Sequence, residues 1–358
     1  LLQRPLDTSS DIATALRDLD ADAPAVEPVI VAWDGTFHPL RLEREPAAAT
    51  LVDENGDEIQ LLVESGMLTA GRPLPLGYHR LHISGIPTPS LVISAPSAAH
   101  PPPHRQLGVM APVYSLRSNR ADTGIGNYGH LGQLAEFAQE VGAAVIGTLP
   151  LVATFPDQPS PYSPASRRAW NEILVDMAAA PGWEGPVPQS TGDSLWVDYD
   201  RTGAAIRNAL ADYAERSKEK PRLRSQIDAF ADSEPEIRAY AEFRAKCDHH
   251  GRNWRAWPAD AVAPPERVAY HLTGQWLASL QLRRLGTNLR KHNQYLYLDL
   301  PIGCHPDGYD IWDQPGIYAA ASVGAPPDSL FLGGQDWGLP APIPHLSRQD
   351  GHTAYIKA

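Results

Sequence analysis

Short apolar runs separated by turn residues fill the first hundred positions of the chain. Residues 29–33 form a continuous apolar run, residues 90–94 have an apolar centre at 91–93, and residues 77–83 alternate between apolar and polar side chains. The runs at 50–52 and 59–63 flank Asn55-Gly56, a pair that favours a hairpin turn because both residues tolerate positive φ. Short strands at this spacing predict a small antiparallel β-sandwich.

A short helix and a stiff linker bound this region. Residues 9–20 have the pattern of an amphipathic helix, with Ile12, Leu16 and Leu19 on one face. Residues 95–105 are rich in proline and carry no apolar pattern, which is typical of a linker between domains. We therefore expect an accessory β-sandwich domain over residues 1–104, with a short helix at its N-terminal end.

The pattern changes after residue 105, where apolar strands alternate with helices. Residues 107–114 and 143–151 are candidate buried strands, and helix spacing at 131–141 lies between them. A charged, helix-rich stretch precedes the next strand pattern at 294–300, which is too much chain for an ordinary connection. The pattern predicts an α/β domain over residues 105–358, with a helical insertion at about 180–292.

Composition restricts the kind of partner. The 358 residues carry a formal net charge of −12, and both nucleic acid and anionic membranes need clustered Lys and Arg, so neither is expected as a partner. No run of 18 apolar residues occurs, so we expect no membrane span. With only Cys247 and Cys304, a disulfide framework is absent and a cytoplasmic location is expected.

One motif suggests a different class of function. Gly124, Gly126 and Gly129 form a G-x-G-x-x-G pattern before a helix, as in dinucleotide-binding oxidoreductases. In that fingerprint the first glycine directly ends a strand, and an acidic residue follows about 20 positions later. Here about ten residues separate Tyr114 from Gly124, and the later position falls in an apolar strand. A glycine-rich loop that enters a helix is the simpler interpretation.

A second cluster could hold a metal ion. His305, Asp307 and Asp310 lie in one short loop after a predicted strand. Zinc sites favour clearer Cys and His spacing, and no further ligands are evident along the chain. We therefore expect no metal at this loop.

Two stiff loops carry groups that suit a sugar. Residues 160–168 combine hydroxyls, a tyrosine and two arginines after a parallel strand, which is where α/β barrels hold their sites. Residues 324–340 are rich in glycine and proline and include a tryptophan and an amide, which offer a stacking face and hydrogen bonds. The alternative interpretations are a rigid surface loop and a structured lid with a core tryptophan.

Taken together, four blocks resemble the N-terminal part of the amylomaltase (4-α-glucanotransferase) family, glycoside hydrolase family 77. The segment Gly-Ala-Pro-Pro-Asp followed by Gly-Gln-Asp-Trp-Gly is the most specific of them. The resemblance implies a β-sandwich followed by a (β/α)8 (TIM) barrel with helical insertions, here truncated to its first strands. The blocks are Tyr114–Ser118 with Gly124–Gly126, Ser160–Pro164 with Arg167, Tyr297–Pro301 with His305–Trp312, and Gly324–Pro340.

The resemblance also implies an activity and a set of binding residues. The family transfers α-1,4-glucan segments between maltooligosaccharides by a retaining double displacement, without a cofactor. Matched to the family motifs, Ser160 and Tyr162 belong to the glucan-binding loop, and Tyr114 and Asn171 are further candidates. The residues near the donor sugars are Asp310 and Trp312, and those of a mobile lid are Pro327, Asp328, Gln335 and Trp337.

The catalytic carboxylates of the family are missing. They lie in Arg-Ile-Asp-His and Gly-Glu-Asp-Leu-Gly segments, and neither segment occurs in the 358 residues. We therefore expect the nucleophile and the acid/base in sequence after Ala358, and we expect this chain alone to be inactive. A natural, non-catalytic glucan-binding protein is the alternative.

Overall fold

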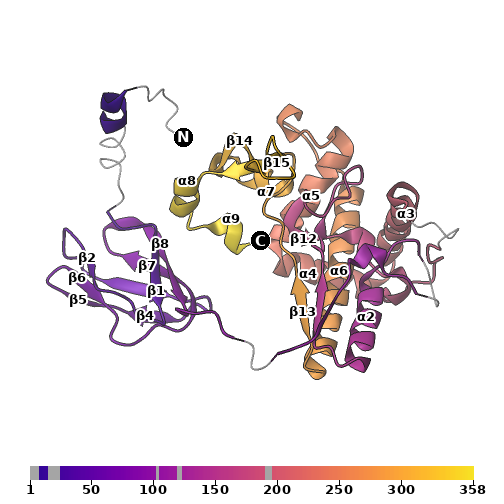
Figure 1. The fold of residues 1–358 in the computed structure, drawn as a ribbon, viewed down its shortest axis with the longest axis horizontal. Coiled ribbons are helices and arrows are strands. Elements are labelled where there is room, and N and C mark those ends of the chain that lie inside the picture. The colour runs from indigo at the N-terminus through magenta and orange to yellow at the C-terminus, as the bar shows by residue number, and fades with distance from the viewer. Residues whose placement is uncertain (1–7, 15–24, 102–104, 119–122, 190–195) are drawn as a thin grey trace. The chain divides into compact units, whose positions relative to one another are not determined.

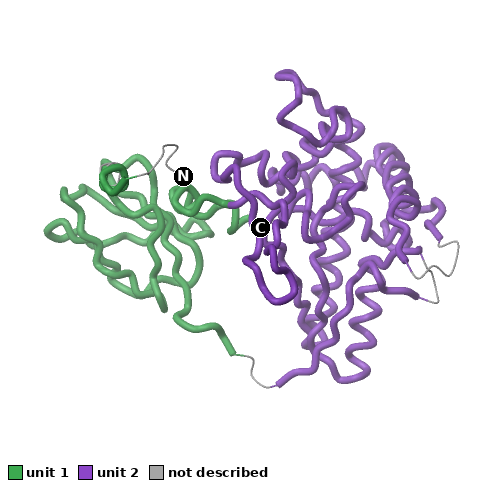
Figure 2. The backbone as a smooth tube through the Cα atoms, turned by 45° about the horizontal axis from the view of Figure 1, so that its top comes forward, with its two compact units in different colours: residues 1–103, 342–357 green, residues 104–341, 358 purple. Residues whose placement is uncertain are grey.

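The computed structural model describes residues 8–14, 25–101, 105–118, 123–189 and 196–358. Its contacts divide the chain into two compact units, coloured separately in Figure 2. The first unit consists of residues 1–103 and 342–357, and the second of residues 104–341 with residue 358. The boundary near residue 104 lies in the proline-rich linker, whereas residues 342–357 group with the first unit and not with the predicted second domain.

Two β-sheets make up most of the first unit. Strand β1 (Val29–Trp33) runs parallel to β8 (Ile86–Ala95), and the other neighbouring strands are antiparallel. The smaller sheet has the order β2 (Leu40–Arg41), β6 (Met67–Thr69) and β5 (Leu62–Glu64). The larger sheet has the order β1 (Val29–Trp33), β8 (Ile86–Ala95), β7 (Gly77–Ile83), β3 (Ala49–Val52) and β4 (Glu58–Gln60).

A single apolar core lies between these two sheets. Leu51 of β3 and Leu81 of β7 share it with Leu68 of β6, and all three are buried. The predicted hairpin is confirmed, because β3 and β4 pair on either side of Asn55-Gly56 and Gly56 has a φ of +88°. Asp53 stabilises this turn by accepting backbone N–H groups of Asn55 and Asp57.

Helical segments at both ends of the sequence complete the first unit. Residues 9–14 are helical, and the rest of the helix predicted at 9–20 lies outside the described residues. Two short helices, α8 (Pro344–Gln349) and α9 (Thr353–Ile356), belong to the same unit. Arg348 of α8 donates to the backbone carbonyl of Val29 at 3.1 Å, which ties this helix to the first strand.

Three parallel strands organise the second unit: β9 (Gly108–Met110), β10 (Val145–Thr148) and β13 (Tyr295–Leu298). Strand β10 is central, so the spatial order follows the chain order. Helix α2 (Tyr128–Glu140) connects β9 to β10 and contacts β10. This arrangement confirms the mixed α/β architecture, but the described residues contain no closed barrel.

Between β10 and β13 the chain forms a helical block (Figure 1). Its central member is α6, which contacts all of the other three. Burial follows from amphipathic spacing, as in α3, where Ile206, Leu210 and Tyr213 face the core. The helices are α3 (Tyr199–Lys218), α4 (Pro221–Ser233), α5 (Pro235–His250) and α6 (Pro265–Lys291).

The two faces of the parallel sheet differ. Ile146 of β10 is buried with Val109 and Leu296 in the core that the helices share. On the opposite face Gly147 pairs with Met110 and Tyr297, and both of these side chains are exposed. The alternation of side chains along a strand therefore gives this sheet one covered face and one open face.

Candidate functional site

The carboxyl ends of the parallel strands bring together polar side chains from distant parts of the sequence. Tyr114 lies in a short 3-10 helix after β9, and Tyr162 lies in the long loop after β10. Asp299 follows β13 directly, and its backbone N–H donates to the carbonyl of Thr148 at the end of β10. In open parallel sheets this edge is where ligands bind.

Tyr162 and Asp299 form the centre of this edge. The Tyr162 hydroxyl donates to Oδ2 of Asp299 at 2.7 Å, across 137 positions of sequence. This hydrogen bond to a carboxylate raises the pKa of Tyr162 above its usual value. The tyrosine is 46% exposed and Asp299 is half-buried, so one aromatic ring and one carboxylate are open to a ligand.

The loop that carries Ser160 and Tyr162 is held at both ends. Strands β11 (Val152–Ala153) and β12 (Ser166–Trp170) pair on either side of it, and the N–H of Ala165 donates to the carbonyl of Ala153 at 2.7 Å. Within the loop, Ser160 is exposed, and its carbonyl accepts the N–H of Ser163 at 3.2 Å. These contacts give the loop a defined shape without a ligand.

Asp310 is buried, and Trp312 is half-buried. Both belong to α7 (Tyr309–Asp313), and the Asp310 carboxylate has no exposed surface. It accepts Nε of Arg167 at 3.1 Å and the hydroxyl of Ser166 at 2.8 Å. Trp312 packs against Phe243 in an aromatic cluster. Asp310 therefore anchors β12, and a sugar contact by either residue stays a prediction.

Asn171 also has a structural position. It is buried and begins a 3-10 helix over Glu172–Leu174, where its Oδ1 accepts the N–H of Ile173 at 3.3 Å. Its Nδ2 donates to Thr154, and its carbonyl accepts the hydroxyl of Tyr128 at 3.0 Å. The residue thus joins the loop after β11 to α2, and its role in binding a glucan stays untested.

The predicted lid is an antiparallel hairpin of β14 (Tyr318–Ala325) and β15 (Gln335–Pro342). Pro327 and Asp328 are exposed in the connecting loop, where Asp328 accepts two backbone N–H groups at 2.7 Å each. Trp337 is 41% exposed, and its Nε1 donates to the Gln335 side chain at 3.2 Å. This tryptophan is therefore not a core residue, and the described hydrogen bonds do not join the hairpin to Tyr162 or Asp299.

The glycine-rich loop at 124–129 does not have the dinucleotide-binding arrangement. Strand β9 ends well before it, and a Cβ on Gly126 would lie 1.8 Å from the carbonyl oxygen of Val113. The N-terminus of α2 is capped by Asn127, whose side chain accepts the N–H of His130. Close packing against Val113 explains the glycine at position 126. The side chain of Asn127 already caps the N-terminus of α2, where a phosphate would bind in a dinucleotide-binding fold.

The described part of the chain contains no group of three or more His, Cys, Asp or Glu side chains arranged to hold a metal ion. In the loop that suggested one, Nδ1 of His305 accepts the N–H of Asp307 at 3.0 Å. Asp307 in turn pairs with Arg255 at 3.2 Å, so its charge is balanced by the protein. The described residues also include no helix long and apolar enough to cross a membrane.

Sequence reasoning did not select Asp299 as a site residue, although it lies inside one of the matched blocks. Its signal is positional, since it is the first charged residue after a parallel strand, at the same edge as the predicted Tyr162. Tyr199, whose ring centre lies 6.5 Å from that of Tyr114, had no comparable signal.

Comparisons with known proteins point in one direction. The model of a family described as 4-alpha-glucanotransferase matches residues 111–358. A 4-alpha-glucanotransferase of Haemophilus influenzae is 28% identical over 374 residues, which cover 88% of this chain and 53% of that protein. One from Mycobacterium tuberculosis is 31% identical over 314 residues, covering 75% of this chain and 43% of its own length.

Solved structures with a similar fold carry related names. The amylomaltase from Corynebacterium glutamicum aligns with a TM-score of 0.79 at 23% identity, covering 99% of this chain and 57% of that one. The amylomaltase from Streptococcus agalactiae in complex with acarbose aligns with a TM-score of 0.61 at 22% identity, covering 71% and 56%. The chain spans about half the length of the curated relatives it matches.

Proposed function

The chain belongs to the 4-alpha-glucanotransferase family, glycoside hydrolase family 77, and from that premise we propose that it serves the transfer of α-1,4-glucan segments between maltooligosaccharides. We also propose that the sheet β9–β10–β13 forms the first strands of a TIM barrel. The sequential strand order and the helical crossovers support this proposal.

The observation that carries the proposal is the pair of Tyr162 and Asp299 at the carboxyl edge of the sheet. A glucose ring presents an apolar face and a rim of hydroxyls. The half-exposed ring of Tyr162 suits the face, and the carboxylate of Asp299 suits a hydroxyl as its acceptor. Ser160 on the same stiff loop supplies a further hydroxyl at the surface.

We assign binding and orientation to these residues, and no catalytic carboxylate. A retaining double displacement needs a nucleophile and an acid/base about 5–5.5 Å apart. The segments that hold these two groups in the family do not occur in the 358 residues. A non-catalytic glucan-binding function is the second candidate.

The other residues selected by the family resemblance fall into an exposed group and a buried group. Pro327, Asp328, Gln335 and Trp337 lie on an exposed hairpin, which suits a lid over the acceptor side. For buried Asp310 we propose a supporting role through Arg167. No cofactor is needed for this chemistry. A cytoplasmic location is consistent with Cys247 and Cys304, both of which are free thiols.

Titration calorimetry with acarbose and maltotriose tests the proposal on the 358-residue chain. Asp299→Ala removes a charged acceptor, so we expect the affinity to fall about tenfold, a loss of roughly 1.5 kcal/mol. Asp228→Ala on the exposed surface of α4 is the matched control and keeps the wild-type affinity. Absence of binding, or equal affinities in both variants, contradicts a glucan site at this edge.

Maltotriose disproportionation by the same sample tests whether these residues bind a glucan without catalysing its transfer. Release of glucose and longer maltodextrins would mean that carboxylates within these residues are catalytic. Binding without products fits the assignment made here.

A further inference from the structure

A second polar site lies in the helical block, away from the sheet edge. It is a cavity of about 500 Å³, within the range of about 300–1,000 Å³ that small-molecule sites occupy. None of Tyr114, Ser160, Tyr162 and Asp299 lines it. Its wall includes Glu172 from the 3-10 helix, Arg207 of α3, Arg244 of α5, and Arg267, Tyr270 and His271 of α6.

Three residues of this wall are deeply buried and each has a polar atom without a partner. Arg244 is 2% exposed, Tyr270 3% and Glu172 4%. The atoms without a hydrogen bond are Nε of Arg244, the hydroxyl of Tyr270 and Oε2 of Glu172. Buried polar groups are almost always paired, because an unpaired one loses its water without compensation. Three such atoms on one cavity indicate a missing hydrogen-bonding partner.

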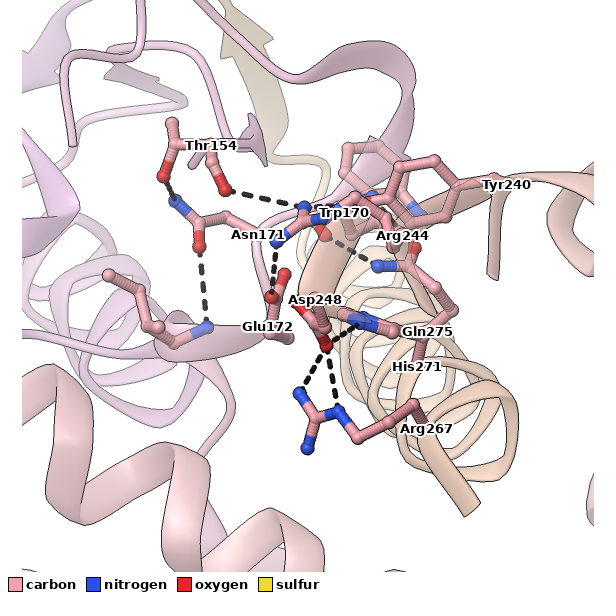
Figure 3. A network of polar contacts seen from close by, with 11 residues as sticks. Thr154, Trp170, Asn171, Glu172, Tyr240, Arg244, Asp248, Arg267, His271 and Gln275 are labelled. Atoms are coloured by element: carbon pink, nitrogen blue, oxygen red, sulfur yellow. Dashed lines mark hydrogen bonds and ion pairs between the residues drawn. The ribbon is translucent and has the colours of Figure 1, made fainter. Parts of the chain in front are cut away.

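The rest of the network is satisfied and fixes the shape of the wall (Figure 3). Arg244 donates to the carbonyl of Thr154 at 3.3 Å and to the hydroxyl of Tyr240 at 2.7 Å, and its Nη2 lies 3.6 Å from Glu172. Asp248 accepts both Arg267 and His271, the latter at 2.9 Å. The atoms without a hydrogen bond are therefore confined to this wall. The neighbouring side chains are held by their own hydrogen bonds and cannot easily turn to pair with them.

The charges on the wall cancel. Arg207, Arg244 and Arg267 face three carboxylates, those of Glu172, Asp248 and Glu266. His271 adds no charge, since burial lowers its pKa. An anion would therefore meet three carboxylates here, and a cation would meet three guanidinium groups.

A neutral ligand with several hydroxyls fits this wall. Each hydroxyl both donates and accepts, so one can serve Oε2 of Glu172 and another Nε of Arg244. Pro156 and Pro264 give apolar surface for the C–H face of a sugar. We propose that this cavity binds a neutral polyol of monosaccharide size, namely a free pyranose such as glucose. The site is separate from the glucan site proposed above and stands without it.

Binding of D-glucose to the 358-residue chain, followed by saturation-transfer NMR, tests this site. Tyr270→Phe removes one hydroxyl and no carbon, and it deletes an unpaired buried group, so the fold keeps its melting temperature. We expect the Kd for glucose to rise at least about fivefold in this variant, since one hydrogen bond is lost.

A rim variant provides an independent reading. Arg207 is half-buried and has no ion-pair partner among the described residues, so we expect Arg207→Met to leave the fold intact. We expect it to weaken glucose binding about tenfold, while Arg224→Met on α4 and Tyr162→Phe at the sheet edge do not change it. No glucose binding, or binding that only Tyr162→Phe weakens, overturns the proposal and leaves a hydrated cavity.

Discussion

The sheet edge and the cavity of the helical block use charged groups in opposite ways. At the edge, Asp299 is half-buried and accepts a hydrogen bond from the hydroxyl of Tyr162. In the cavity, Arg244 and Glu172 are both buried and are tied into contacts with several elements. A surface pair contributes little to stability, whereas breaking a buried pair leaves an uncompensated charge. Substitutions at the sheet edge can therefore alter ligand binding with little loss of stability, whereas substitutions in the cavity wall destabilise the fold.

The largest effect expected from this contrast follows from Arg244→Met. The substitution leaves the Glu172 carboxylate buried without its partner, so we expect a loss of about 3–5 kcal/mol in the free energy of unfolding. Urea unfolding followed by tryptophan fluorescence measures it, because Trp33 alone of the tryptophans lies outside residues 104–341.

Two further variants make this prediction specific. Adding Glu172→Gln to Arg244→Met removes the unpaired charge and recovers part of the loss. At the edge, Asp299→Asn changes stability by less than about 0.5 kcal/mol. A loss below about 1 kcal/mol for Arg244→Met would show that water reaches the cavity wall freely, and the two regions would then not differ.

A smaller effect concerns the pH dependence of stability. Burial lowers the pKa of His271 in the folded chain, while the unfolded value is about 6.5. Below pH 6.5 His271 is therefore protonated more in the unfolded state than in the folded state, so the free energy of unfolding falls as the pH falls. One such histidine accounts for at most about 1.4 kcal/mol between pH 7.5 and 5.5.

Unfolding free energies of wild type and His271→Gln at these two pH values test this expectation. The variant keeps a donor for Asp248 and loses the titrating group, so its pH dependence is flatter than that of the wild type. His345→Gln, at an exposed position in α8, is the control for the same replacement outside the helical block. Equal slopes in all three proteins would mean that the pKa of His271 is the same in the folded and unfolded states.

The sequence pattern predicted turns and strands well where the residues that determine them are close together in the sequence. Asn55-Gly56 produces a hairpin because tight hairpin turns need positive φ angles, which these two residues tolerate themselves. The three parallel strands follow from apolar runs, and the edge of the sheet follows from their direction. This rule singled out the loop at 160–168, the family resemblance selected Tyr162 within it, and the same rule applied to the next strand selects Asp299.

The cavity could not be predicted, because its contacts are distant in sequence. Arg244 meets Thr154 across 90 positions, and nothing near Arg244 distinguishes it from the exposed charges of the same helical stretch. The buried ion pair of Asp310 with Arg167 has the same origin, since a carboxylate in a polar loop suggests exposure. Pairing partners that compensate a buried charge are set by tertiary packing, and a single sequence does not display them.

The smallest effect, and the sharpest test of the edge, is the titration of Tyr162. Its hydroxyl donates to a carboxylate, which opposes ionisation and raises the pKa of this tyrosine. Asn at position 299 carries no charge, so Asp299→Asn moves this pKa back toward its ordinary value of about 10 with almost no change in stability.

Thirteen tyrosines overlap in an ultraviolet titration, so the curve of Tyr162 is obtained by subtraction. Wild type minus Tyr162→Phe gives its pKa with Asp299 present, and Asp299→Asn minus the double variant gives its pKa without the carboxylate. If both differences titrate at the same pH, the hydrogen bond at 2.7 Å does not persist in solution. The edge would then be an unconnected tyrosine and carboxylate, and a bound glucan would have to bring the two together.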